Sequence, residues 1–131
     1  MTIRSFRDLL PVLTVICALA GAPAIAADGF VPGIDDLPLM PGLAALAGQS
    51  VVFDAPGGRV IDAWAEGAVT QGDVLSFYGS TLPQLGWTVA APDLFRREGE
   101  TLRLEFPARA DRLQQPAATG ALLVRFYLSP G

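Results

Sequence analysis

One segment near the middle of the chain has the apolar spacing of a helix, and segments with the spacing of strands lie on both sides of it. Thr70 followed by Asp73 is the pattern of a capping box at the start of a helix. Pro83 and Gly86 favour an end near Leu82, because proline is costly inside a helix and glycine adopts the positive φ that stops one. Apolar residues at three- and four-residue spacing predict one buried face, made of Val74, Phe77, Tyr78, Thr81, Leu82 and Leu85.

Before this helix, two strands are predicted at Ser50–Phe53 and Arg59–Glu66, joined by turn residues around Pro56. After it, a two-residue turn is predicted at Gly99-Glu100 and a long loop at Ala108–Thr119. The later strands are predicted at Trp87–Ala90, Leu94–Glu98, Thr101–Phe106 and Ala121–Leu128. The order ββαββββ predicts an α+β fold: a single antiparallel sheet of five to six strands with one helix packed on one face.

The first residues have the charged, apolar and small-residue order of a secretory signal peptide. Arg4 and Arg7 precede an apolar run, and Ala24 and Ala26 occupy the positions that a cleavage site requires. We therefore expect a signal peptide at residues 1–26, cleavage near Ala26, a periplasmic location and no membrane span afterwards. An uncleaved anchor is the alternative, but Pro11 interrupts the run and no basic stop-transfer cluster follows it.

The remaining chain divides into a Pro/Gly-rich extended arm at residues 27–48 and a single α+β domain at residues 49–131. Prolines and glycines between Asp28 and Gly42 argue against a regular element in the arm. Its apolar side chains predict packing against the domain through Phe30, Leu37, Leu39 and Leu43.

The side chains that most enzymes use are missing. The chain has no histidine and no lysine, and its one cysteine, Cys17, lies in the predicted signal peptide. We therefore expect no enzyme activity, no cofactor and no metal site; Asp35-Asp36 supplies too few oxygen ligands for calcium. Without the signal peptide the net charge is about −5, which argues against nucleic-acid binding.

Strand alternation predicts apolar residues on the sheet face that the helix does not cover. Val60, Trp64, Leu123 and Tyr127 would lie there and form an interaction patch, unless the arm or the long loop covers them. Our leading hypothesis is a non-catalytic module that docks an envelope protein through this face or through an open edge strand. The sequence leaves the identity of the partner and the oligomeric state open.

Two other functions are weighed against this one. A carrier of a small apolar ligand would use a pocket between helix and sheet, lined by Phe77, Leu82, Trp87 and Phe126. A carboxylate-dependent hydrolase of envelope polymers, which we rank last, would need a pair such as Asp62 with Glu66 or Glu98 with Glu105.

Two motifs resemble those of small exported proteins of alphaproteobacteria, a family without an assigned activity. One is Phe53-Asp54-Ala55-Pro56-Gly57-Gly58-Arg59, and the other runs from Phe77-Tyr78 to Leu82-Pro83-Gln84-Leu85-Gly86-Trp87. The resemblance spans about Leu37 to Leu128 and implies a compact α+β domain in the envelope. It brings no catalytic or binding residues.

Overall fold

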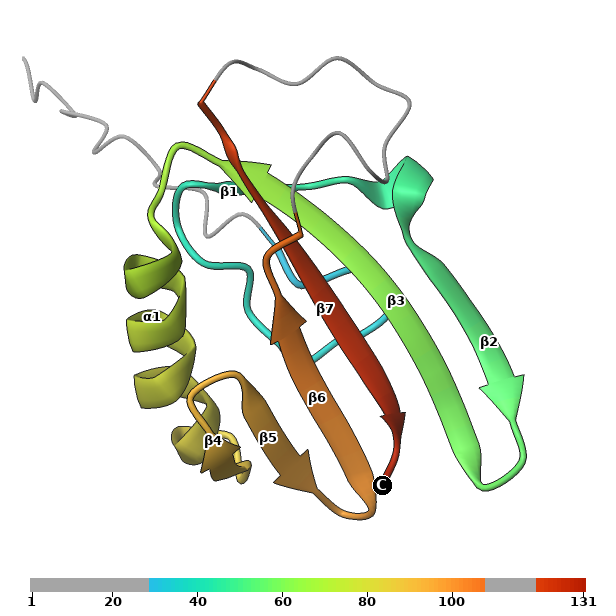
Figure 1. Cartoon of the computed structure of the whole chain (residues 1–131). Helices are drawn as coiled ribbons and strands as arrows, with labels where there is room; N and C mark the ends of the chain where they lie inside the picture. The colour runs from blue at the N-terminus through green and yellow to red at the C-terminus, as the bar shows by residue number, and fades with distance from the viewer. Residues whose placement is uncertain (1–28, 108–119) are drawn as a thin grey trace, which may run out of the picture.

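The computed structural model describes residues 29–107 and 120–131 (Figure 1). The signal peptide predicted for residues 1–26 and the loop predicted for Ala108–Thr119 lie outside the described residues.

The described residues form one antiparallel sheet and one α-helix, so the predicted α+β class is confirmed. The strands follow the order β1-β3-β7-β6-β5-β4 across the sheet, and β2 also pairs with β3. There are seven strands because the edge beside β3 is divided into β1 and β2. The elements are β1 (Leu43–Ala45), a 3-10 turn (Ala47–Gln49), β2 (Val51–Ala55), β3 (Gly58–Gly67), α1 (Gln71–Gln84), β4 (Thr88–Ala91), β5 (Leu94–Arg97), β6 (Glu100–Glu105) and β7 (Leu122–Pro130).

Helix α1 begins as predicted. The Thr70 side chain accepts a hydrogen bond from the Asp73 amide, and the Asp73 carboxylate accepts one from the Thr70 amide, which completes the capping box. The helix passes Pro83 and ends at Gln84, two residues later than predicted, because a proline in the last turn displaces only a final hydrogen bond. Gly86 has a φ of 87° and closes the helix with Trp87, whose amide bonds to the Leu82 carbonyl.

The core lies between α1 and one face of the sheet. Val74, Tyr78 and Leu82 are the buried residues of α1, while Phe77 and Leu85 are partly buried against the same core. The sheet contributes alternate residues, as strand geometry requires, namely Ile61, Ala63, Ala65, Phe95, Leu102, Leu104, Val124, Phe126 and Leu128.

The segment predicted as an extended arm is part of this core. Leu37, Leu39 and Leu43 are buried as predicted, but Phe30 is 58% exposed and makes only an isolated strand-like bridge to Pro38. Val31 and Ile34 are buried as well. The predicted arm also contains strand β1, so the structure places core-forming residues ahead of the predicted domain start at residue 49.

The hairpin of β2 and β3 is confirmed, and its turn is Pro56-Gly57. Between β5 and β6 the turn differs from the prediction. Arg97 pairs with Glu100, so the two turn residues are Glu98 and Gly99, one position earlier than Gly99-Glu100. Both have positive φ, 49° and 78°, the combination found in type I′ hairpin turns.

Candidate interaction surface

The four residues of the predicted patch lie on the sheet face away from α1. Val60, Trp64 and Leu123 stand outside the core cluster, as the alternation predicted, yet they are only 3–7% exposed. Tyr127 is partly exposed. The register brings this face together, because Asp62 lies opposite Tyr127 and Trp64 lies opposite Arg125. Most of the predicted patch is therefore not available at the surface.

Arg125 occupies the centre of this face. Its guanidinium donates two hydrogen bonds to Asp62, of 2.8 and 2.7 Å, and one of 2.8 Å to Glu105. The same group lies 5.5 Å from the ring centre of Trp64 and 4.9 Å from that of Tyr127. The hydrogen bonds to Asp62 are the main reason why the pKa of Arg125 is raised, and the one to Glu105 adds to it. Arg125 therefore stays charged and anchors the face.

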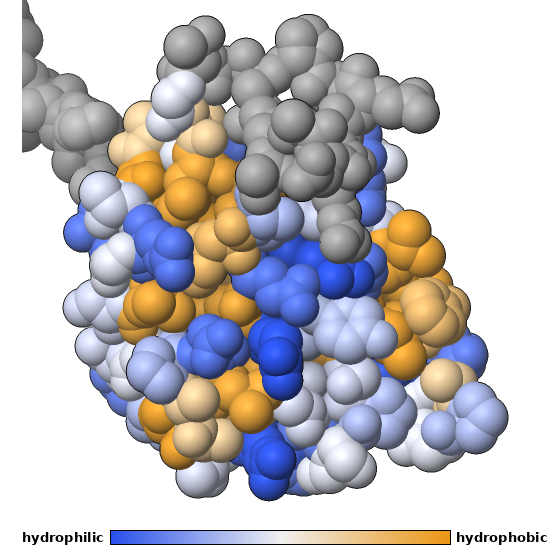
Figure 2. All heavy atoms as spheres, in the orientation of Figure 1, coloured by the Kyte–Doolittle hydropathy of each residue, from blue (hydrophilic) through white to orange (hydrophobic). Residues whose placement is uncertain are grey.

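This ion network places hydrophilic side chains in the middle of the viewed surface. Figure 2 shows a hydrophilic band there, with hydrophobic residues at the edge where β2 lies. Sequence reasoning missed the network, because it depends on the register of three strands, β3, β7 and β6. The sequence signal was the set of charged residues at outward positions of these strands: Asp62 and Glu66 on β3, Arg103 and Glu105 on β6, and Arg125 on β7.

The two carboxylate pairs considered for hydrolysis are not formed. Asp62 and Glu66 are four residues apart along β3, which separates their Cα atoms by about 13 Å. Glu98 lies in the turn before β6 and Glu105 is the last residue of β6, so these two are farther apart still. Instead, Asp62 and Glu105 are both ion-paired with Arg125.

The residues of the predicted ligand pocket belong to the packed core. Leu82 and Phe126 are fully buried, Trp87 is 3% exposed, and Phe77 is partly buried with its ring edge-on to Tyr78 at 5.0 Å. The structure brings the four residues to the boundary of helix and sheet, where neighbouring side chains fill the space.

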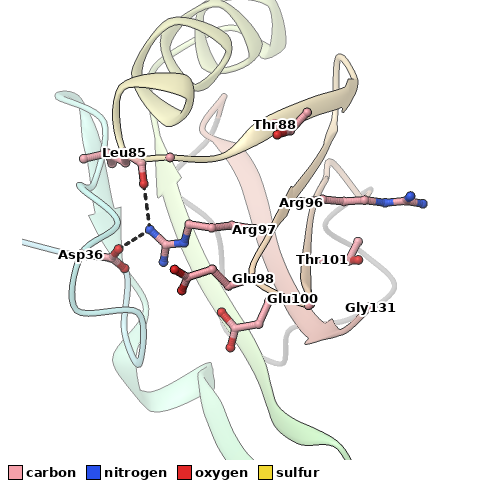
Figure 3. A pocket seen from close by; sticks show the side chains of 11 residues that line it. Asp36, Leu85, Thr88, Arg96, Arg97, Glu98, Glu100, Thr101 and Gly131 are labelled. Carbon is pink, nitrogen blue, oxygen red and sulfur yellow. Dashed lines mark hydrogen bonds and ion pairs between the residues drawn. The ribbon is translucent and has the colours of Figure 1, made fainter.

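A cavity of about 760 Å³ lies elsewhere, beside the end of α1 and the β5–β6 turn. Figure 3 shows Arg97 pointing into it, held by Asp36 and by the Leu85 carbonyl, while Arg96 points away. The guanidinium of Arg97 also stacks over Trp87, 4.4 Å from the ring centre. Two buried donors at this place, Arg97 Nε and Trp87 Nε1, have no hydrogen-bond partner among the described residues.

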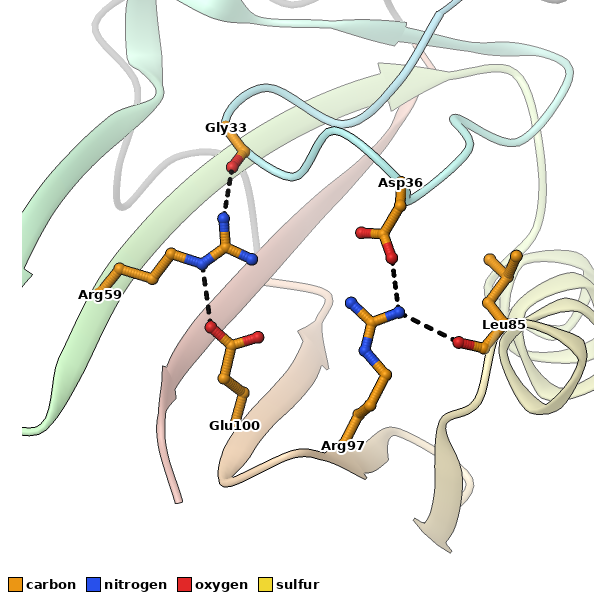
Figure 4. A network of polar contacts seen from close by, with 6 residues as sticks. All are labelled: Gly33, Asp36, Arg59, Leu85, Arg97 and Glu100. Atoms are coloured by element: carbon orange, nitrogen blue, oxygen red, sulfur yellow. Dashed lines mark hydrogen bonds and ion pairs between the residues drawn. The ribbon is translucent and has the colours of Figure 1, made fainter.

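Two arginines hold residues 33–36 to the sheet (Figure 4). Arg59 binds Glu100 at 2.9 Å and reaches the Gly33 carbonyl, and Arg97 binds Asp36. The Arg97 hydrogen bond lowers the pKa of the Asp36 carboxyl, and the Glu100 hydrogen bond raises the pKa of Arg59. Most charged groups around the cavity are thus used in holding residues 33–36 in place.

Within residues 29–107 and 120–131, three of the five exposed large apolar side chains lie on the edge strand β2. Val51, Val52 and Phe53 are consecutive, lie on both sides of the strand, and are 55%, 56% and 50% exposed. Sequence reasoning predicted this strand but gave no sign that it lies at an edge. The opposite edge, β4, exposes one large apolar side chain, Val89.

The backbone of β2 also has free hydrogen-bonding groups. Ala55 and Gly58 close a two-residue turn and so bond to each other, and bonded pairs alternate from there. Phe53 and Val51 therefore bond to β3, whereas the N–H and C=O groups of Val52 and Asp54 point outward. In the part of the chain that the structure describes, these four groups have no hydrogen-bond partner.

A comparison with known protein families, with curated proteins and with solved structures found no match. Among the described residues, no helix has the length and apolar character needed to cross a membrane. The same residues contain no group of three or more acidic, histidine or cysteine side chains arranged to hold a metal ion.

Proposed function

We propose that this protein is a non-catalytic interaction module of the bacterial cell envelope, and that it binds its partner through the open edge strand β2. The observation that carries the proposal is the combination on β2 of three exposed apolar side chains with four unpaired backbone groups. An extended segment of a partner can add to such an edge as a further strand, with backbone hydrogen bonds for affinity and apolar contacts for specificity.

The contrast between the two edges of the sheet supports β2 as the binding edge. Proteins commonly blunt exposed edges with bulges, short strands, prolines or charges, because open edges aggregate. Strand β4 has four residues and an irregular register between Val89 and Ala91. Strand β2 has five residues in regular register and a single charged residue, Asp54. An apolar edge without such protection is typical of a strand that is covered in the working protein.

The location in the envelope rests on the signal-peptide pattern of residues 1–26 and on the family resemblance. The non-catalytic character rests on the absence of histidine and lysine from the whole chain and on the use of Asp62 and Glu105 in ion pairs with Arg125.

In-cell photo-crosslinking tests this proposal. A photoreactive residue replaces Asp54 on β2, and in a second strain replaces Val89 on β4. We expect a defined crosslinked product from position 54 and none from position 89.

Two variants at position 52 test whether the crosslink depends on an outward backbone N–H group of β2. Val52→Pro removes an outward N–H that β3 does not use, whereas Val52→Thr keeps that N–H and a branched side chain. Loss of the product in the proline variant alone, with its circular dichroism unchanged, supports edge pairing. A product that survives in the folded proline variant contradicts it.

A further inference from the structure

We infer that β2 is the strand through which two copies of this chain pair, antiparallel to each other, about a two-fold axis at Phe53. The inference rests on the proposed function, since it names the partner of the same edge. The result would be one continuous sheet shared by two copies.

The length of the open edge determines this register. On one side, the 3-10 turn Ala47–Gln49 interrupts the edge; on the other, the turn at Pro56-Gly57 ends it. A second strand can therefore pair only along Val51–Ala55, and Phe53 is the middle residue of that segment. Two copies overlap along the whole segment only when Phe53 of one lies opposite Phe53 of the other.

The backbone groups fit the same register. With Phe53 opposite itself, Val52 of one copy lies opposite Asp54 of the other, and these are the two residues whose N–H and C=O groups point outward. Each such pair exchanges two hydrogen bonds, so the two pairs satisfy all the outward groups of both strands. A shift by one residue would bring outward groups of one strand against groups that already bond to β3.

Side chains and charges are also compatible with this pairing. The two Phe53 rings come together in a non-hydrogen-bonded pair, the closer of the two kinds in antiparallel sheets, and Val51 lies opposite Ala55. Val60 pairs with Phe53 within each copy but is only 7% exposed, so the apolar contact at the axis comes from Phe53 itself. The two Asp54 carboxylates are diagonal neighbours, roughly 7–8 Å apart at their Cα atoms, and stay in water.

The contact is small. A ladder of five residues per copy falls at the low end of specific interfaces, below about 1,200 Å² of total buried surface. We therefore expect a weak, concentration-dependent dimer and not a permanent one.

The test is a charge exchange at the two-fold axis, followed by sedimentation equilibrium of the purified chain up to about 1 mM. Phe53→Lys and Phe53→Glu each place like charges opposite each other, so each variant alone should dimerise at least about tenfold more weakly than the wild type. An equimolar mixture places opposite charges together and should recover association. Val89→Lys and Val89→Glu, on the other edge strand, are matched controls that should leave the wild-type Kd unchanged.

Two outcomes overturn the inference. One is a wild-type chain that remains monomeric over the whole range, and the other is a dimer that survives in folded Phe53→Lys. Circular dichroism and thermal unfolding establish that each variant is folded.

The crosslinking experiment then distinguishes a failure of this inference from a failure of the proposed function. A monomeric chain that still gives a heterologous crosslink from position 54, lost in Val52→Pro, removes the second copy as partner and leaves β2 as the binding edge. A monomeric chain without any product from position 54 removes both.

Discussion

The side chain of Ser50 accepts a hydrogen bond of 3.1 Å from the backbone amide of Trp64, at the point where the edge strand leaves β3. Between β1 and β2 the edge loops out into a 3-10 turn, so the Trp64 amide has no strand carbonyl opposite it. The Ser50 hydroxyl takes that role and donates in turn to the Leu46 carbonyl. This contact positions the start of β2, and with it the length of open edge available to a partner.

Ser50→Ala should lower the free energy of unfolding by about 1–2 kcal/mol, because it leaves the Trp64 amide without a partner. Urea unfolding measures this value. Ser80→Ala is the matched control: the Ser80 hydroxyl bonds to the Ser76 carbonyl on the exposed side of α1, where water can replace it. Equal losses in both variants would mean that the Trp64 amide finds another acceptor.

Tyr78 joins helix α1 to residues 38–40. Its hydroxyl donates to the Pro38 carbonyl at 2.9 Å and accepts from the Met40 amide at 3.1 Å. Burial raises the pKa of this hydroxyl, so it remains a donor at all ordinary pH values. Tyr78→Phe should cost about 1–3 kcal/mol in urea unfolding, since two partners lose their bonds.

Proteolysis gives a second readout for Tyr78→Phe. Cleavage near residues 38–40 should become faster, because this segment loses its bonds to the helix. Tyr127→Phe serves as the control, since the Tyr127 ring is partly exposed and contacts Arg125 through its face. If both variants unfold alike, the hydroxyl of Tyr78 does not hold the segment.

The sequence predicted the elements whose signals are local. The capping box at Thr70 and the glycine stop at Gly86 lie within one helical turn of the ends they define, and the alternation of β6 decides its own inner face. Each of these signals can be read without knowing the neighbours of the element. For that reason the fold class and the helix were predictable.

What depends on strand neighbours was not predictable. The run Val51–Phe53 reads equally well as a buried strand, and only the pairing order places it at an edge. Trp64 was assigned to the correct face, but its burial depends on side chains from other strands, among them Arg125. For this reason the sequence predicted an interaction patch on the sheet face, whereas the exposed apolar side chains lie on the edge strand β2.

Glu98 is the one described residue other than glycine with a positive φ, 49°. Asparagine tolerates this region better than glutamate, so Glu98→Asn should raise the free energy of unfolding by about 0.5–1 kcal/mol. Glu98→Gln removes the same charge without easing the backbone and should leave stability nearly unchanged. A gain of equal size in Glu98→Gln, measured by thermal unfolding, would assign the effect to charge instead.

The ion pair of Asp36 with Arg97 should give a pH-dependent contribution to stability. The Arg97 hydrogen bond lowers the pKa of Asp36 in the folded protein, so this contribution is present above the ordinary carboxyl pKa of about 3.9 and is lost as pH falls through the lower, folded value. Asp36→Asn should therefore be less stable than the wild type at pH 7, and the difference should shrink in acid.

Urea unfolding between neutral pH and pH 3 follows this difference. Because the Asp36 side chain is 51% exposed, added salt should reduce the difference at pH 7 as well. Asp35→Asn removes a neighbouring charge and leaves the Arg97 bond in place, so it should not reproduce the acid dependence. A difference between Asp36→Asn and wild type that stays constant from pH 7 to pH 3 would show that the carboxylate charge is not what holds residues 33–36 to Arg97.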